Sequence, residues 1–103
     1  MIIIRDLTKM IKEEIRSAEK YAKNAMSYKE SDIELADIFY RLSTENISRV
    51  GVLHDCIVRI INEYKQHRGE PPKEMMAIYN YVHEEEVELV KEIRLLLEMF
   101  KTN

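Results

Sequence analysis

The chain has 103 residues, of which 46% are hydrophobic and 34% are charged, and its formal net charge is −3. These values predict one globular domain with a modest core that oligomerisation would help to stabilise. Acidic and basic residues alternate along the chain, which argues against the clustered basic patch of a nucleic-acid-binding or membrane-surface protein.

The N-terminus and the single cysteine bear on where the protein works. The opening MIII is followed at once by Arg5 and Asp6, so this apolar run is too short for a signal peptide or a membrane span. Cys56 lies in an apolar run, and we expect it to be a buried, inert thiol in a reducing compartment. We therefore expect a cytoplasmic protein with neither a membrane nor a nucleic acid as its partner.

Two Gly, two Pro and no Trp indicate an all-α fold rather than a turn-rich β protein. The first amphipathic helix is predicted at about residues 6–28. It ends before Ser31 and Glu34, which have the spacing of a capping box, and Asp32 can also accept from the first free N–H groups of the next helix. These signals predict a tight turn between the first two helices.

The second helix is predicted at about residues 32–67. Gly69 is placed to end it, and the following Pro71 and Pro72 cannot continue a helix. A third helix is predicted to start near Pro72. Short connections make sequential helices antiparallel neighbours, so we expect one three-helix domain over residues 1–103.

A carboxylate interrupts the apolar face of the first helix. At about 100° per residue, Glu14 falls at the centre of this face. An ionised carboxylate is costly to bury unless a metal, a cation or hydrogen bonds satisfy it, so we expect a partner for Glu14. The apolar residues of the predicted face are Leu7, Met10, Ile11, Ala18, Tyr21, Ala25 and Tyr28.

The other two helices show similar interruptions. Asn46 and Arg49, three residues apart on one face, occupy the stripe of the second helix, and Glu86 lies between Val82 and Leu89 on the third. We predict one polar layer inside the bundle. It comprises Glu14, Asn46, Arg49, Glu86 and Tyr21. The apolar stripes around it comprise Leu35, Ile38, Phe39, Leu42, Leu53, Cys56, Ile57, Ile60 and Tyr64 on the second helix, and Met75, Ile78, Tyr79, Val82, Leu89, Ile93, Leu96, Leu97 and Phe100 on the third.

Carboxylates and an i, i+3 polar pair that project into a helical bundle are typical of di-iron carboxylate proteins. Glu14, Ala18 and Tyr21 match the pattern of the first metal-binding helix of the ferritin-like superfamily. The segment ELADIFYRLSTENISRVGVLHD, residues 34–55, resembles its second helix, and GEPPKEMMAIYNYVHEE, residues 69–85, is similar to small rubrerythrin-like proteins of bacteria and their phages. The resemblance implies a ferritin-like bundle.

The chain departs from this family at the second-helix ligands. The family's Glu-x-x-His motif falls on Asn46 and Arg49, and a shift of one residue aligns Glu45 with the Glu but leaves Ser48 in place of the His. Of the matching ligand positions only Glu14 remains. The resemblance therefore implies a degenerate di-iron site, and iron-dependent activity does not carry over.

A guanidinium at Arg49 supplies fixed positive charge where an iron centre would have supplied it, and it can bind a carboxylate through two hydrogen bonds. We expect Arg49 to meet Glu14, with Asn46 and either Glu86 or Tyr21 completing the hydrogen bonds. For a buried pair, removal of Arg49 would cost roughly 3 to 5 kcal/mol. The alternative is that Glu14 and Glu86 lie at a wet edge of the bundle.

A residual metal site is a further alternative, because a histidine and two carboxylates can bind zinc or iron. Its candidate ligands are Glu14, Glu45, Glu86, His54 and His83. His54 and His83 flank their apolar stripes and are otherwise expected as boundary residues. His67 sits at a helix C-terminus, where we expect it to be exposed.

The sequence has no nucleophile with a nearby base, no glycine-rich phosphate loop and no CxxC pair, so it does not indicate an enzyme. The preferred hypothesis is a non-catalytic ferritin-like structural or protein-binding module without a cofactor. One alternative is an iron-binding protein with residual ferroxidase or peroxide chemistry, and another is a phage or mobile-element inhibitor or adaptor. A homodimer formed through the first two helices would complete a four-helix bundle.

Overall fold

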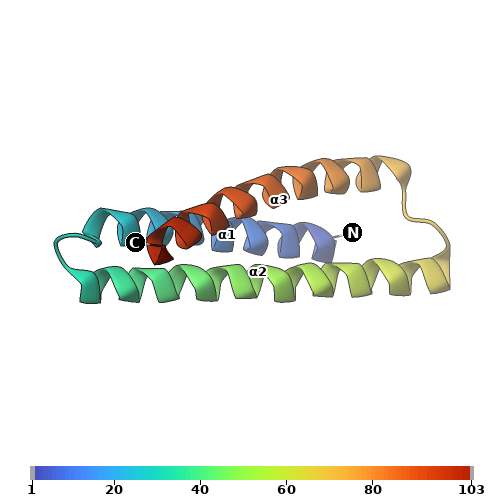
Figure 1. Cartoon of the computed structure of the whole chain (residues 1–103). Helices are drawn as coiled ribbons and strands as arrows, with labels where there is room; N and C mark the ends of the chain where they lie inside the picture. The colour runs from blue at the N-terminus through green and yellow to red at the C-terminus, as the bar shows by residue number, and fades with distance from the viewer. Residues whose placement is uncertain (1, 103) are drawn as a thin grey trace.

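The computed structural model describes residues 2–102, and three long helices account for almost all of them (Figure 1). Helix α1 spans Ile2–Tyr28, α2 spans Ile33–Arg68 and α3 spans Lys73–Lys101. The all-α prediction is confirmed, since residues 2–102 contain no strand. Across the same residues, no helix combines the length and the apolar character needed to cross a membrane.

Local sequence signals account for the helix boundaries between α1 and α3. The Asp32 carboxylate accepts a hydrogen bond of 3.1 Å from the backbone N–H of Leu35, so Asp32 caps α2. Gly69 follows the end of α2 with a φ of 79°, a backbone conformation that favours glycine. Pro72 precedes the first residue of α3. These boundaries agree with the prediction to within one or two residues.

The start of α1 differs from the prediction. The helix begins at Ile2 rather than near Asp6. Ile4 lies in the added turn and is only 5% exposed, and its burial continues the seven-residue spacing of Ile11 and Ala18. Most of the stability of a helix in a protein comes from such packing. The burial of Ile4 therefore explains why α1 begins before Asp6.

Helices α1 and α2 form a closely packed antiparallel hairpin. Ala18 and Ala36 have no exposed surface and Ala22 is 1% exposed, so small side chains lie where the two helices approach each other. The Ser43 hydroxyl, also fully buried, donates a hydrogen bond of 2.7 Å to the Ala18 carbonyl. A buried hydroxyl needs such a partner. This hairpin holds the main core of the protein.

The buried arc of α1 is rotated relative to the predicted apolar face. Met10 and Tyr28 are 47% and 41% exposed, so their prediction as core residues is wrong. Glu14 and Tyr21 lie at the edge of the arc and are half-buried. The cause is that α1 contacts α3 as well as α2, which turns its buried arc toward both helices. The buried residues are Ile4, Leu7, Ile11, Ile15, Ala18, Ala22 and Ala25.

The C-terminal half of α3 anchors this helix to the hairpin. Its buried apolar residues, Ile93, Leu97 and Phe100, all lie in that half. Lys29, in the α1–α2 turn, donates a hydrogen bond of 2.6 Å to the Phe100 carbonyl. Helix α3 contacts α1 more extensively than α2.

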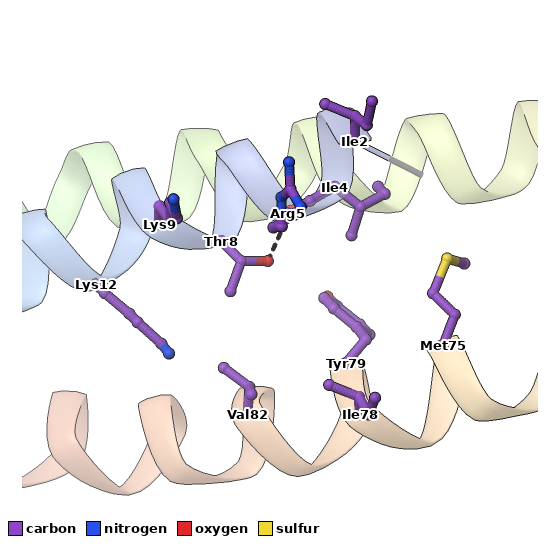
Figure 2. A pocket seen from close by; sticks show the side chains of 10 residues that line it. All are labelled: Ile2, Ile4, Arg5, Thr8, Lys9, Lys12, Met75, Ile78, Tyr79 and Val82. Atoms are coloured by element: carbon purple, nitrogen blue, oxygen red, sulfur yellow. Dashed lines mark hydrogen bonds between the residues drawn. The ribbon is translucent and has the colours of Figure 1, made fainter.

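The N-terminal half of α3 is less closely packed, and here the predicted core face is wrong in part. Ile78 is 67% exposed, because α3 makes its deep contacts further along. Leu89, just beyond the midpoint of α3, is still 39% exposed. This half of α3 and the start of α1 border an open cleft, the α1–α3 cleft (Figure 2).

On α2, two more predictions need correction: Ile38 is 44% exposed, and Cys56 is half-buried rather than fully buried.

Candidate functional site

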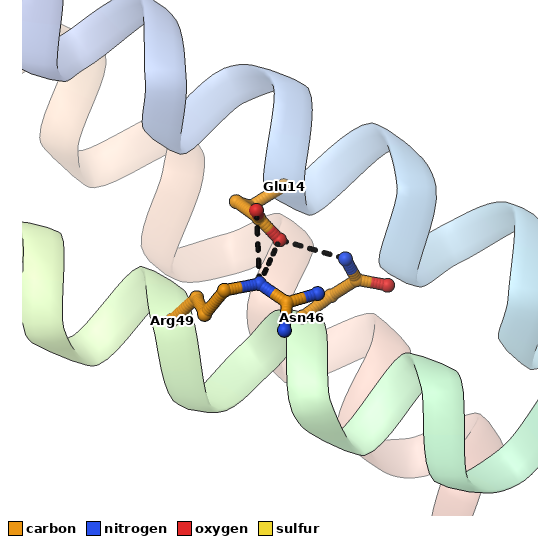
Figure 3. Close-up of polar contacts among 3 residues, drawn as sticks. All are labelled: Glu14, Asn46 and Arg49. Atoms are coloured by element: carbon orange, nitrogen blue, oxygen red, sulfur yellow. Dashed lines mark hydrogen bonds and ion pairs between the residues drawn. The ribbon is translucent and has the colours of Figure 1, made fainter.

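Glu14 connects α1 to α2 through a set of short hydrogen bonds (Figure 3). The Nδ2 group of Asn46 donates to Oε2 of Glu14 at 2.7 Å. The Nε group of Arg49 lies 3.0 Å from Oε1 and 3.1 Å from Oε2 of the same carboxylate. Asn46 and Arg49 can both reach Glu14 because residues three apart share a helix face. The prediction that Arg49 and Asn46 meet Glu14 is confirmed.

The Glu14 contact lies at the edge of the helix interface. The Glu14 side chain is 25% exposed and that of Arg49 is 51% exposed, whereas Asn46 is only 4% exposed. Partial burial raises the pKa of Glu14, but the hydrogen bonds from Asn46 and Arg49 and the positive charge of Arg49 outweigh it, so the pKa lies below its usual value. Glu14 is therefore ionised at neutral pH. The expectation that it lies at the centre of the buried face is wrong, and its position is closer to the wet-edge alternative.

Glu86 is separate from this contact. It is 9% exposed, and within residues 2–102 its Oε1 atom has no hydrogen-bond partner and no hydrogen bond joins it to Glu14, Asn46 or Arg49. Burial raises the pKa of Glu86 to about 7, although the charge of Lys12 acts in the opposite direction. The structure thus places a carboxylate that can hold a proton near neutral pH between α1 and α3.

Tyr21 contributes packing next to Glu14. Its ring stacks on Phe39 with 6.0 Å between centroids, and Tyr28 stacks on the same ring at 5.9 Å. In the described part of the chain, no hydrogen bond joins Tyr21 to Glu14. The aromatic group continues the α1–α2 contact toward the turn.

His54 and His83 form a stacked pair that the sequence pattern did not predict. The rings of His54 and His83 stack at 4.7 Å with an interplanar angle of 14°. With Glu86 they line a cavity of about 290 Å³ that is bordered by all three helices. Burial, and then the neighbouring His54, lower the pKa of His83. The pairing depends on how α3 docks, which local spacing cannot show. His67 is exposed at the end of α2, as expected.

The donor set does not fit an iron centre. Arg49 has no lone pair with which to bind a metal, and it occupies the carboxylate of Glu14 together with Asn46. Glu45 is exposed and takes no part in this contact. Between residues 2 and 102, no group of three or more His, Cys, Asp or Glu side chains is arranged to hold a metal ion. The geometry is that of a polar contact between α1 and α2.

Comparisons of the chain with protein-family models, with curated proteins and with solved structures gave no match.

Replacing Arg49 with alanine tests the energetic weight of the Glu14 contact. Hydrogen bonds to a charged group contribute about 1.5 to 3 kcal/mol, but half-exposed pairs are screened, so we expect Arg49→Ala to lower the free energy of unfolding by about 1 kcal/mol. This is less than a fully buried pair would lose. Urea unfolding of the variant measures it.

Arg59→Ala is the matched control, because Arg59 pairs with Glu63 at 2.8 Å on an exposed surface, with side chains 63% and 56% exposed. Its expected cost is at most about 0.5 kcal/mol. Equal losses in the two variants would contradict the special role of Arg49.

The raised pKa of Glu86 predicts a pH dependence of stability. Because the folded state binds this proton more tightly than the unfolded state, the free energy of unfolding falls as pH rises from the ordinary value of 4.5 to about 7. Glu86→Gln cannot ionise and should keep this stability. We expect the variant to unfold like the wild type near pH 4 and to be about 2 to 3 kcal/mol more stable near pH 8.

Urea unfolding across this pH range measures the effect, with Glu92→Gln, an exposed carboxylate on the same helix, as the control. Parallel pH profiles for Glu86→Gln and the wild type would contradict the assignment.

Proposed function

We propose that this chain is a non-catalytic, ferritin-like helical module that acts by binding protein, and that its first partner is a second copy of itself. The observation that carries the proposal is an apolar face of the α1–α2 hairpin that α3 does not cover. We call it the open hairpin face. It comprises Ile3, Met10, Tyr21 and Tyr28 of α1 with Ile38, Leu42, Cys56 and Ile60 of α2.

The position of this face follows from helical geometry. On α1, the residues that border α3 include Arg5, Thr8 and Arg16, and the residues of the open hairpin face point away from them. Figure 3 views the hairpin from this side, with α3 passing behind it. The face is therefore available to another molecule along most of the hairpin.

The exposure of the face supports a docking role. Ile3 and Met10 are each 47% exposed, and Tyr28 and Ile38 are 41% and 44% exposed. The remaining members are half-buried. An apolar strip of this length on two adjacent helices is typical of an interaction surface rather than of scattered surface residues.

The charges at its centre favour a second copy as the occupant. Glu14 uses the Nε group of Arg49, whereas within residues 2–102 the Nη1 and Nη2 groups of Arg49 have no hydrogen-bond partner (Figure 3). In a two-fold dimer the same surface of both copies meets, so each contact occurs twice. The free Arg49 N–H groups of one copy would then face the Glu14 carboxylate of the second copy, and the reverse. Heptad spacing on α1 suits the shallow crossing of a four-helix bundle.

We expect static light scattering at micromolar concentration to give the mass of two chains. Met10→Glu should reduce this to the mass of one chain, because it places a carboxylate of each copy in the apolar contact. Met99→Glu is the matched control, since Met99 on α3 is 46% exposed against 47% for Met10.

Circular dichroism should show that both variants keep their helix content. A wild-type mass of one chain would contradict the proposed self-association, and so would dissociation by Met99→Glu to the same extent.

A further inference from the structure

We propose that the α1–α3 cleft binds an amphiphilic carboxylate of the fatty-acid type. The cleft has a volume of about 480 Å³, within the range of small-molecule sites (Figure 2). Its walls combine an apolar surface with a row of cations. The lining residues are Ile2, Ile4, Arg5, Thr8, Lys9, Lys12, Met75, Ile78, Tyr79 and Val82.

The apolar wall suits a hydrocarbon chain. Ile78, Tyr79 and Val82 present it from α3, and Ile4 faces them from α1. Ile2 and Ile78 are 70% and 67% exposed, so a bound chain would remove apolar surface from water, which is worth about 25 cal/mol per Å². The Thr8 hydroxyl already donates to the Ile4 carbonyl at 2.8 Å, so it does not demand a polar ligand.

The cationic row suits a carboxylate. Arg5, Lys9 and Lys12 follow one another at intervals of four and three residues, which places them on one side of α1. Among the described residues none of the three forms an ion pair, although Lys12 lies in the field of Glu86. Like charges at this spacing repel one another, and a bound anion would relieve the repulsion.

The two walls together select the chemistry of the ligand. Among residues 2–102, no carboxylate side chain lines the cleft. Figure 2 shows Lys12 extending into the space between α1 and α3. The ligand head therefore lies along the Lys9 and Lys12 side, and its tail lies against Ile78 and Val82. A single acyl chain is much thinner than a peptide helix, which is about 10 Å across. The acyl chain therefore suits a cleft of about 480 Å³ better. The cleft is on the other side of α1 from the open hairpin face, so this inference is independent of the proposed function.

Dodecanoate is the probe, titrated below its micellar concentration into the isotope-labelled full chain and followed by NMR. We expect saturable shifts of the Ile2, Ile78 and Val82 methyl groups. The double variant Lys9→Glu/Lys12→Glu should bind about tenfold more weakly or worse, a difference of about 1.4 kcal/mol, because two cations of the cleft wall are replaced by carboxylates that repel the head group. Lys20→Glu, an exposed lysine of α1 outside the cleft, should bind like the wild type.

Two further ligands test the dual character of the cleft. Acetate lacks the chain and dodecanol lacks the charge, so each should bind more weakly than dodecanoate. Absence of dodecanoate binding, or equal binding by the wild type and the double variant, would overturn the proposal. It would also be overturned if an acidic amphipathic peptide shifted the same methyl groups while dodecanoate did not.

Discussion

An ionised carboxylate beside a closely packed helix interface must keep its hydrogen bonds, and the structure meets this constraint at Glu14 with Asn46 and Arg49. One turn further along α1, the Ala18 carbonyl accepts from Ser43, also one turn away on α2. These two polar contacts fix how α1 and α2 align, and the small residues between the helices allow that close approach. The alignment in turn places the apolar rows of both helices beside each other on the open hairpin face.

Helix α3 is the less tightly bound part of the molecule. Because its buried apolar residues lie in its C-terminal half, its N-terminal half stands over α1 without filling the space between them. The α1–α3 cleft results from this arrangement. The protein therefore offers two surfaces of different chemistry on opposite sides of α1, an apolar strip centred on a neutralised ion pair and a cleft with one cationic wall.

Much of the fold could be predicted from the sequence because its signals are local. Asp32, Gly69 and Pro72 mark helix ends through their own backbone and side-chain chemistry, and their roles hold in the structure. The meeting of Glu14 with Asn46 and Arg49 was also predictable, because a polar pair at i, i+3 in an apolar stripe implies a facing partner.

What could not be predicted depends on the docking of α3. The burial of Ile15 rather than Met10 reflects a buried arc of α1 that serves two neighbours. The separation of Glu86 from Glu14 and the stacking of His54 on His83 have the same origin. Periodicity along one helix gives a face, but it does not show how that face is shared between two partners.

Glu14 is an ionised carboxylate that accepts hydrogen bonds from Asn46 and Arg49. An NMR titration of its side-chain carboxyl group in the wild type and in Asn46→Ala tests this most directly. We expect a wild-type pKa below the ordinary value of 4.5 and a higher pKa in the variant, which has lost one hydrogen bond to the charged form. A wild-type pKa at or above 4.5 that does not respond to Asn46→Ala would contradict it.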